Sequence, residues 1–329
     1  MLNENSIFAM FQRNLSRYVR EIIAFLLGFI VGLTYMSALL LMRYGVISEI
    51  FSPKSYTNVR NEYNITCKFS YYYKFLKELK KDRYRVLRVI DFIRLARNGS
   101  LPRDKVIVIL RHDVDASPQR AFLMSRLEYN ASIYSTYYIR IRGPYNIFEE
   151  NFYEWLIWLH DNGFEIGLHY ETLYLTNYNF SLAEKMFLSD LNVLRSIVPV
   201  YTVCSHGNSP RQKYPNYEIF RRNKTLLEIA ELEGEAYVTI HELIDILRRN
   251  ESIAGYIYLS DTYKRDIDWI GKLREVNLGT VVYILIHPDN WYLDKKLIPL
   301  IKPNLTKRWW FWNSRLSGLG SSTVRGSHP

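Results

Sequence analysis

Five short, mostly apolar runs in this chain each lead directly into an Arg, Ser-His or His side chain, and this repeated pattern limits the possible folds. The runs cover residues 106–110, 133–139, 165–168, 200–204 and 281–286. Runs of this length are typical of buried strands. Helix-like segments separate them, which predicts a mainly parallel sheet with right-handed crossovers. We therefore expect an α/β fold, a distorted (β/α) barrel of about seven strands, with its functional groups at the carboxyl ends of the strands.

The rest of the chain is divided by composition. One helix is expected over residues 71–97, ending at Asn98-Gly99, and further strands are expected at 236–240 and 256–259. The length of 329 residues allows one large catalytic domain. We expect a cytoplasmic segment at 1–20, a transmembrane helix at 21–43, a linker and helical lead-in at 44–100, the catalytic domain at 101–306 and an aromatic, flexible tail at 307–329. The aromatic part of the tail is expected to pack on the barrel, with the membrane interface as the alternative.

The segment between Ile22 and Met42 contains no charged residue. A helix needs about 20 apolar residues to cross a bilayer, so this segment predicts a membrane span. A cleaved signal peptide is the alternative, but the apolar part of such a signal is shorter and no small-x-small cleavage site follows. Three arginines precede the span and only Arg43 follows it closely. This asymmetry places the N-terminus in the cytoplasm and the catalytic domain outside the cell.

Glycosylation sequons agree with an extracellular domain. Eight Asn-x-Ser/Thr sequences are present, and seven of them follow the predicted span. They begin at Asn14, Asn64, Asn98, Asn130, Asn179, Asn223, Asn250 and Asn304. Chance in an Asn-, Ser- and Thr-rich chain is the alternative explanation. The two cysteines, Cys67 and Cys204, could form one disulfide outside the cell, but their spacing marks no metal or redox site.

The chain has a formal net charge of +10. This charge favours binding to anionic surfaces, either lipid head groups or acidic polysaccharide. Nucleic acid is not an expected partner, because no basic helix or nucleic-acid motif accompanies the charge.

Asp113 and Asp115 follow the first of the five runs and flank Val114. In an extended segment their side chains point to the same side. Two carboxylates this close remain ionised only if a cation or a base partner compensates them. One metal ligand and one general base meet this condition. The alternative for Asp115 is an N-cap of the following helix.

Three histidines arrive at the ends of other runs, namely His169, His206 and His287. Histidines at strand ends are natural ligands for zinc or a similar divalent ion. Together with the Asp-x-Asp pair, they indicate a metal-assisted hydrolase.

At these residues the chain resembles the polysaccharide deacetylases, carbohydrate esterase family 4, over roughly residues 105–292. The Arg-His-Asp-Val-Asp sequence at 111–115 resembles the first family motif, in which one Asp is the general base and the other binds metal. Gly-Phe-Glu-Ile-Gly-Leu-His at 163–169 resembles the second motif. Asp261, with Trp269 downstream, and His287 correspond to later motifs, an Asp near a Trp and a His that serves as general acid.

The resemblance implies a catalytic domain of the deacetylase type that holds a divalent metal, Zn²⁺ in the first place, with Co²⁺, Ni²⁺ or Mn²⁺ as alternatives. Asp115 and His169 would be metal ligands, Asp113 the base and His287 the acid. Arg111 or Arg140 would keep Asp113 ionised by charge pairing.

One position departs from the family pattern. The family has a second metal-binding His four residues after the first, and here that position is Leu173. His206 and Glu171 are the two substitutes for the third ligand, and His206 is preferred because it arrives on its own strand end.

The expected function is removal of N- or O-acetyl groups from a polysaccharide or glycan by an enzyme anchored in the membrane through residues 22–42. Two alternatives remain. One is a catalytically inactive carbohydrate-binding or scaffold protein of the same fold, and the other is a metal-dependent amide hydrolase with a non-sugar substrate.

Overall fold

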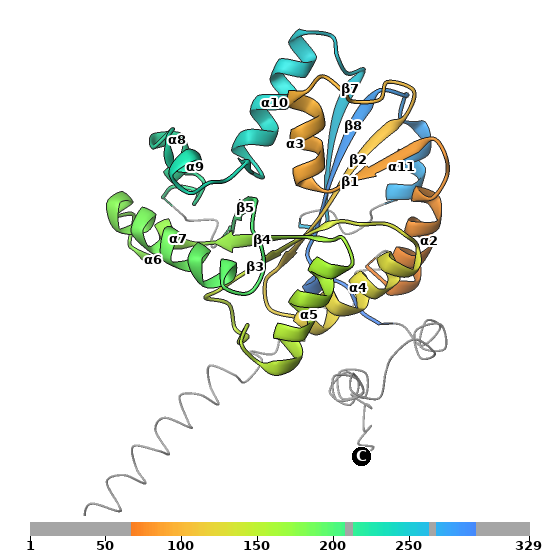
Figure 1. Ribbon diagram of the computed structural model, residues 1–329. Coiled ribbons are helices and arrows are strands. Elements are labelled where there is room, and N and C mark those ends of the chain that lie inside the picture. Colours follow the sequence, from red (N-terminus) through yellow and green to blue (C-terminus); the bar gives the residue numbers. More distant parts are fainter. Residues whose placement is uncertain (1–66, 208–212, 263–267, 294–329) are drawn as a thin grey trace, which may run out of the picture. The chain divides into compact units, whose positions relative to one another are not determined.

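The computed structural model describes residues 67–207, 213–262 and 268–293 (Figure 1). These residues belong to one unit, Asn64–Pro329. The expected cytoplasmic segment at 1–20, the transmembrane helix at 21–43 and the tail at 307–329 lie outside the described residues. Within the described residues, no helix is both long enough and apolar enough to cross a membrane.

The described residues form one sheet of eight strands at the centre of this unit. The strands are β1 (Tyr84–Leu87), β2 (Val106–Val114), β3 (Thr136–Ile139), β4 (Glu165–Tyr170), β5 (Thr202–Ser205), β6 (Gly234–Glu235), β7 (Gly255–Ser260) and β8 (Thr280–Ile286). Their order is β6-β5-β4-β3-β2-β8-β7, with β1 paired to β2 outside this path. Every pairing among them is parallel. The sheet curls like an incomplete barrel, which confirms the expected α/β class with about seven strands in the main path.

Strand β2 pairs with three other strands, and all nine of its residues are buried. Strand β8 pairs with residues 107–112 of β2. On the opposite edge of β2, β1 pairs with residues 106–109 and β3 with residues 111–114, so β1 and β3 follow one another along one edge. A parallel strand covered on both faces reads as a continuous apolar run, which is why β2 was visible in the sequence.

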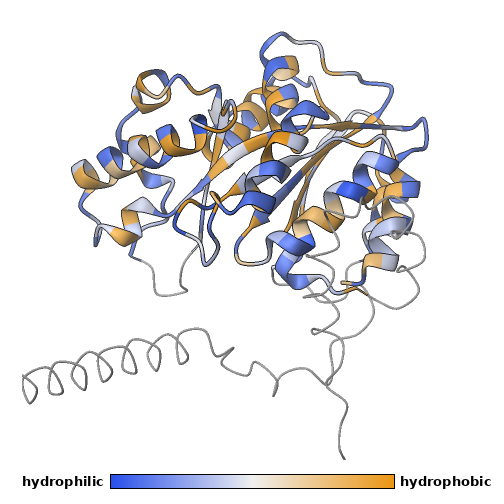
Figure 2. Ribbon diagram, turned by 60° about the horizontal axis from the view of Figure 1, so that its bottom comes forward, coloured by the Kyte–Doolittle hydropathy of each residue, from blue (hydrophilic) through white to orange (hydrophobic). Residues whose placement is uncertain are grey.

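Helices cover both faces of the sheet (Figures 1 and 2). They are α2 (Phe69–Leu79), α3 (Val89–Arg97), α4 (Pro118–Asn130), α5 (Glu150–Asp161), α6 (Thr172–Leu175), α7 (Phe180–Arg195), α8 (Glu218–Arg222), α9 (Leu226–Ile229), α10 (Val238–Arg249), α11 (Trp269–Glu275) and the 3₁₀ turn η2 (Pro288–Asn290). Val108 and Leu110 of β2 lie in a core with α2, α4, α5, α7 and α11. Ile107 and Ile109 lie in a second core with α3 and α10. The alternation follows from the two-residue repeat of a strand.

The prediction of one helix over residues 71–97 was wrong in its middle. The chain forms α2, then β1 at Tyr84–Leu87, then α3. Strand β1 exists because it pairs with β2 from Tyr84 opposite Val106 to Leu87 opposite Ile109. This pairing joins segments about 20 residues apart, and a local helical pattern contains no sign of it.

The predicted strand at residues 236–240 was also wrong. Strand β6 contains only Gly234 and Glu235, and α10 begins at Val238. The buried Glu235 carboxylate accepts the backbone N–H groups of Tyr237 and Val238, both at 2.7 Å, and so satisfies donors at the start of the helix. Apolar residues at 240, 244 and 247 belong to the second core at helical spacing.

Candidate metal centre

Strands β2, β4 and β5 bring the Asp-x-Asp pair and two of the predicted histidines together. Asp113 lies near the end of β2 and Asp115 directly follows it, His169 lies near the end of β4, and His206 directly follows β5. Because β2, β3, β4 and β5 are paired in parallel, their carboxyl ends meet at one edge of the sheet. This is the edge at which the sequence predicted a site.

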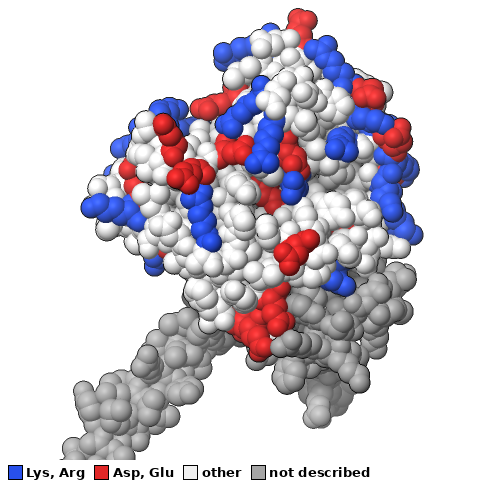
Figure 3. Space-filling model, in the orientation of Figure 1, with Lys and Arg blue, Asp and Glu red and all other residues white. Residues whose placement is uncertain are grey.

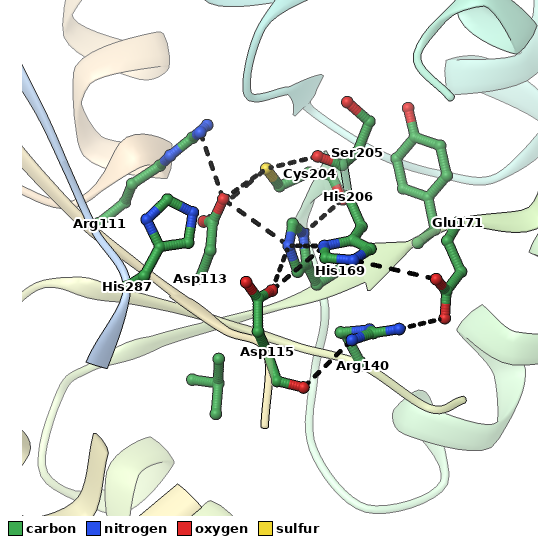
Figure 4. A network of polar contacts seen from close by, with 12 residues as sticks. Arg111, Asp113, Asp115, Arg140, His169, Glu171, Cys204, Ser205, His206 and His287 are labelled. Atoms are coloured by element: carbon green, nitrogen blue, oxygen red, sulfur yellow. Dashed lines mark hydrogen bonds and ion pairs between the residues drawn. The ribbon is translucent and has the colours of Figure 1, made fainter. Parts of the chain in front are cut away.

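Asp115, His169 and His206 form a group of ligand atoms that could hold a metal ion (Figure 4). The Oδ1 atom of Asp115 is 3.3 Å from His169 Nε2 and 3.1 Å from His206 Nδ1. The two histidine nitrogens are 3.2 Å apart. In a tetrahedral zinc site with bonds of about 2.0 to 2.1 Å, ligand atoms are about 3.3 Å apart. The three side chains therefore have the separations of zinc ligands and leave a fourth position free.

Further contacts hold the His169 ring and the backbone segment of Asp115. The Nδ1 atom of His169 lies 3.1 Å from the carbonyl oxygen of Cys204. An Nδ1–H that donates to this carbonyl leaves the Nε2 lone pair directed at the group, as second contacts do for metal-binding histidines. The backbone N–H groups of Asp115 and Ala116 donate to Asp289 Oδ2, each at 3.2 Å. Asp289 follows β8, so η2 holds the segment that carries Asp115.

Glu171 lies beside the centre and does not belong to its ligand group. Its Oε1 atom accepts a hydrogen bond from Arg140 Nη2 at 2.6 Å, while Oε2 is 4.0 Å from His206 Nε2. Arg140 also donates to the backbone oxygen of Asp115 at 3.2 Å. Glu171 therefore lies beside His206, and Arg140 beside Asp115, without either being one of the three ligands. The arginine that pairs with the Asp113 carboxylate is Arg111 and not Arg140.

Leu173, at the position where the resembled family has a second histidine, is fully buried in the core in α6. His206 comes instead from the next strand and lies next to His169. Of the two substitutes considered from the sequence, His206 is thus the one within ligand distance of both His169 and Asp115.

Charges within the group lower the pKa of Asp115. Burial alone would raise it, but the hydrogen bonds and charges of His169 and His206 outweigh burial and hold the pKa well below its usual range. The pKa of His206 is lowered, chiefly by burial, against the opposing effect of Asp115. Both shifts favour the ionised carboxylate and the neutral imidazole, which are the forms that bind a metal.

Asp113 lies deeper than Asp115, with 1 % of its surface exposed. Its Oδ2 atom is 3.4 Å from Arg111 Nη2, 3.7 Å from His169 Nε2 and 3.6 Å from Cys204 Sγ. Asp113, His169 and Cys204 form a second group of atoms that could hold a metal ion. Burial raises the pKa of the Cys204 thiol well above its ordinary value.

Arg111 is completely buried, yet its charge has partners. Its Nη1 atom donates to the Tyr283 hydroxyl at 2.8 Å, and its guanidinium lies 4.3 Å from the centre of the Tyr237 ring. Tyrosine faces attract a cation, and Asp113 supplies the opposite charge. Burial would lower the pKa of Arg111, but Asp113 and the neighbouring groups raise it, so the arginine remains charged.

His287 and Asp261 form a second pair at this edge. His287 Nδ1 is 2.7 Å from Asp261 Oδ1, and the backbone N–H of His287 donates to Oδ2 at 2.9 Å. Burial would lower the pKa of His287, but the hydrogen bond and charge of Asp261, with further contributions from Asp113 and Asp115, raise it to about 9. Its Nδ1 is engaged by Asp261, so Nε2 is the nitrogen that can donate to another molecule.

The tryptophan that contacts Asp261 is not the one named from the sequence. Trp291 Nε1 donates to Asp261 Oδ2 at 2.9 Å. Trp269 is buried in α11 with its ring 5.5 Å from the Trp291 ring. Cys204 and Asp289 also lie at the centre, and neither was predicted from the sequence as a site residue. Asp289 and Trp291 stand two and four residues after His287, and this closeness in sequence was the available signal.

The fold and the site define an α/β protein with a barrel-like parallel sheet and a candidate metal centre at the carboxyl ends of its strands. No family model matches the chain, and no curated protein matches it either.

Proposed function

We propose that this protein is a membrane-anchored, extracellular, zinc-dependent deacetylase that removes acetyl groups from a polysaccharide or glycan. The observation that carries the proposal is the group Asp115, His169 and His206, whose ligand atoms are 3.1–3.3 Å apart. Asp113 and the protonated His287 accompany this group. A metal centre with a base and an acid is what hydrolysis of an acyl bond requires.

The donor set fits a divalent ion. One carboxylate and two imidazoles match the ligands of catalytic zinc sites, which keep one position open. The side chains of Asp115 and His206 are 27 % and 14 % exposed, so solvent and substrate can reach the open side. A divalent ion held there would polarise an acyl carbonyl and make water a stronger nucleophile at neutral pH.

The remaining steps belong to side chains of the protein. Asp113 accepts a proton from the attacking water, and Arg111 places a positive charge beside this carboxylate. The water oxygen forms a bond with the acyl carbon. His287 donates its Nε2 proton to the leaving nitrogen or oxygen as the acyl bond breaks, which gives acetate and a free amine or alcohol. Asp261 holds the imidazole in place and stabilises its charge.

The first test is the metal content of the purified full-length chain, measured by elemental analysis after incubation with Zn²⁺ and removal of free ion. We expect about one zinc ion per chain, as in catalytic sites of this ligand number, and its loss in both His169→Ala and His206→Ala. His241→Ala is the matched control, since His241 lies on α10 and belongs to neither ligand group. Zinc retained in both ligand variants would contradict the assignment.

The second test is release of acetate from acetylated glycans by the zinc-loaded protein. Acetate released from a glycan supports the proposal. Bound zinc with acetate released only from non-sugar amides would replace it with the amide hydrolase. Failure to bind zinc would favour a carbohydrate-binding protein that has the fold without the chemistry.

A further inference from the structure

The candidate centre contains two overlapping sets of ligands. We call Asp115, His169 and His206 the outer position, and Asp113, His169 and Cys204 the inner position. All three residues of the inner position are buried, whereas Asp115 and His206 are partly exposed. Figure 4 shows the inner position on the Arg111 side of His169, away from Glu171.

The distances in the inner position are close to those of a thiolate metal site. Cys204 Sγ is 3.6 Å from Asp113 Oδ2, and His169 Nε2 is 3.7 Å from the same oxygen. Tetrahedral bonds of about 2.3 Å to sulfur and about 2.1 Å to oxygen separate these two ligands by about 3.6 Å. The Asp113–Cys204 pair therefore already has the required spacing, and the ligand nitrogen of His169 lies within 4.8 Å of both other ligand atoms.

The two positions exclude each other because they share one nitrogen. His169 Nδ1 is engaged by the carbonyl oxygen of Cys204, so only Nε2 is free to bind an ion. That single lone pair serves one ion at a time. The outer position offers oxygen and nitrogen atoms only, while the inner position adds sulfur. Soft ions prefer thiolate ligands, so the softness of the ion decides which position is occupied.

We propose that Asp113, His169 and Cys204 form a second metal position, which soft divalent ions such as Cd²⁺ occupy in place of the outer one. On binding, the S–H bond of Cys204 breaks, the sulfur–metal bond forms, and the proton leaves to solvent. Two anionic ligands then face the ion, and Arg111 remains the nearest cation on the other side of Asp113. If the proposed deacetylase function holds, soft ions inhibit it, because Asp113 cannot be ligand and proton acceptor together.

The test is titration of the full-length protein with Cd²⁺, followed by the ultraviolet charge-transfer absorption of a cadmium–thiolate bond. Wild type and Cys67→Ser should develop the band, and Cys204→Ser should not. Cys67 is the matched control because it is the other cysteine of the chain. Loss of a residue that only hydrogen-bonds to a metal ligand already costs 10- to 100-fold in metal affinity. Loss of the ligand itself in Cys204→Ser should therefore weaken Cd²⁺ binding by at least about tenfold.

His206→Ala separates the two positions. It should keep the cadmium band while its zinc affinity falls by at least about tenfold, and His169→Ala should lose both. A wild-type protein without the band, a Cys204→Ser variant that still binds Cd²⁺ as wild type does, or a His206→Ala variant that loses the band would each overturn the inner position.

These readouts need no turnover, so the two proposals can fail separately. A cadmium band without acetate release upholds the inner position and removes the deacetylase. Acetate release without a cadmium band supports the deacetylase and rules out the inner position. With both present, Cd²⁺ should inhibit acetate release by the wild type more strongly than by Cys204→Ser.

Discussion

The carboxylate of Asp113 has contacts with side chains from three strands. Arg111 of its own strand β2, His169 of β4 and Cys204 of β5 all lie within 3.8 Å of its oxygens. Arg111 and Asp113 share one face of β2 because they are two residues apart. His112, between them, points to the opposite face and contacts Glu128. One strand thus supplies the proposed base and its counter-charge to the site, and a histidine to the core.

Asp113→Asn tests the proposed base at this scale. The amide keeps the size of the side chain but cannot accept the proton, so turnover should fall by about 10² to 10⁴. Zinc content should be unchanged, because Asp113 does not belong to the outer position. Acetate release and elemental analysis on the same sample provide the check. Full activity in Asp113→Asn would remove this residue from the base role.

The pair His287–Asp261 predicts a specific pH dependence. A proton donor with a pKa of about 9 is protonated at neutral pH, so deacetylation should decline as the pH rises through about 9. Asp261→Asn removes the largest effect that raises this pKa, while burial continues to lower it. The decline should therefore move to lower pH, and rates measured from pH 5 to 10 would show the shift. An unmoved alkaline limb would mean that another group donates the proton.

The same pair contributes to stability with a defined sign. The pKa of His287 in the folded protein is above its ordinary value of 6.5. The stabilisation is therefore fully present below about pH 6.5 and is lost as the pH rises through about 9. Asp261→Asn should flatten this part of the dependence of unfolding free energy on pH.

Secondary-structure elements are tied together by a second buried network, centred on Glu128 of α4. Its carboxylate accepts hydrogen bonds from Ser135 at 2.7 Å and from Tyr137 at 2.8 Å, contacts His112 Nε2 at 2.6 Å, and also accepts one from Tyr72 of α2. The network joins α2 and α4 to β2 and to the segment of β3. Burial and the neighbouring Glu128 raise the pKa of both tyrosines, which keeps them neutral donors.

Replacing Glu128 with Ala should destabilise the protein strongly. The change leaves four buried polar groups without their common acceptor and breaks a buried pair, so we expect a loss of about 3 to 5 kcal/mol in the free energy of unfolding. Chemical denaturation measures it. Glu242→Ala is the control, because this glutamate is 60 % exposed and pairs with Lys224 at the surface. It should change stability by less than about 1 kcal/mol, and equal effects of the two variants would refute the role of the network.

Gly167 allows strand β4 to lie close to its two neighbouring strands. A Cβ atom there would lie 2.3 Å from the Tyr138 ring and 2.6 Å from the backbone oxygen of Thr202. The absence of a side chain lets β4 lie this close to its neighbours, two residues before His169. A glycine within a strand often marks a close backbone approach of this kind.

At the scale of the whole molecule, the strands and site residues that could be predicted are those with a local sequence pattern. Apolar runs that end at polar residues marked β2, β4, β5 and β8, and parallel pairing then brought their ends to one edge. The partners that were missed depend on tertiary contacts. Cys204 is an apolar-looking core residue until β4 and β5 pair, and Trp291 reaches Asp261 only after the turn at η2. Strand β1 likewise exists through its pairing with β2.

Positive and negative side chains are interspersed on the face shown in Figure 3 rather than separated into one basic patch. The sequons of the described region are all at its surface. Asn98, Asn130, Asn179 and Asn250 are exposed, and Asn223 is partly exposed. All five are therefore accessible as glycan acceptors if this region is outside the cell.

Production of the full-length chain in a glycosylating secretory pathway tests the proposed topology. We expect modification at one or more of these five asparagines and none at Asn14, which precedes the predicted span. Treatment with an endoglycosidase should increase electrophoretic mobility, and an Asn→Gln variant at all five positions should lose most of that shift. A chain modified at Asn14 alone would reverse the orientation.

The short turn η2 after β8 connects His287 to the segment that carries Asp115. His287 precedes this turn, and Asp289 within it holds the backbone N–H groups of Asp115 and Ala116. Arg120 of α4 donates to the backbone oxygen of Asp289 as well. The contacts of η2 therefore hold the proposed proton donor His287 and the segment of Asp115 in fixed positions relative to each other. If the protein is the proposed deacetylase, this fixed spacing selects the bonds that can be cleaved, and the proposed catalytic groups need little reorganisation when a substrate binds.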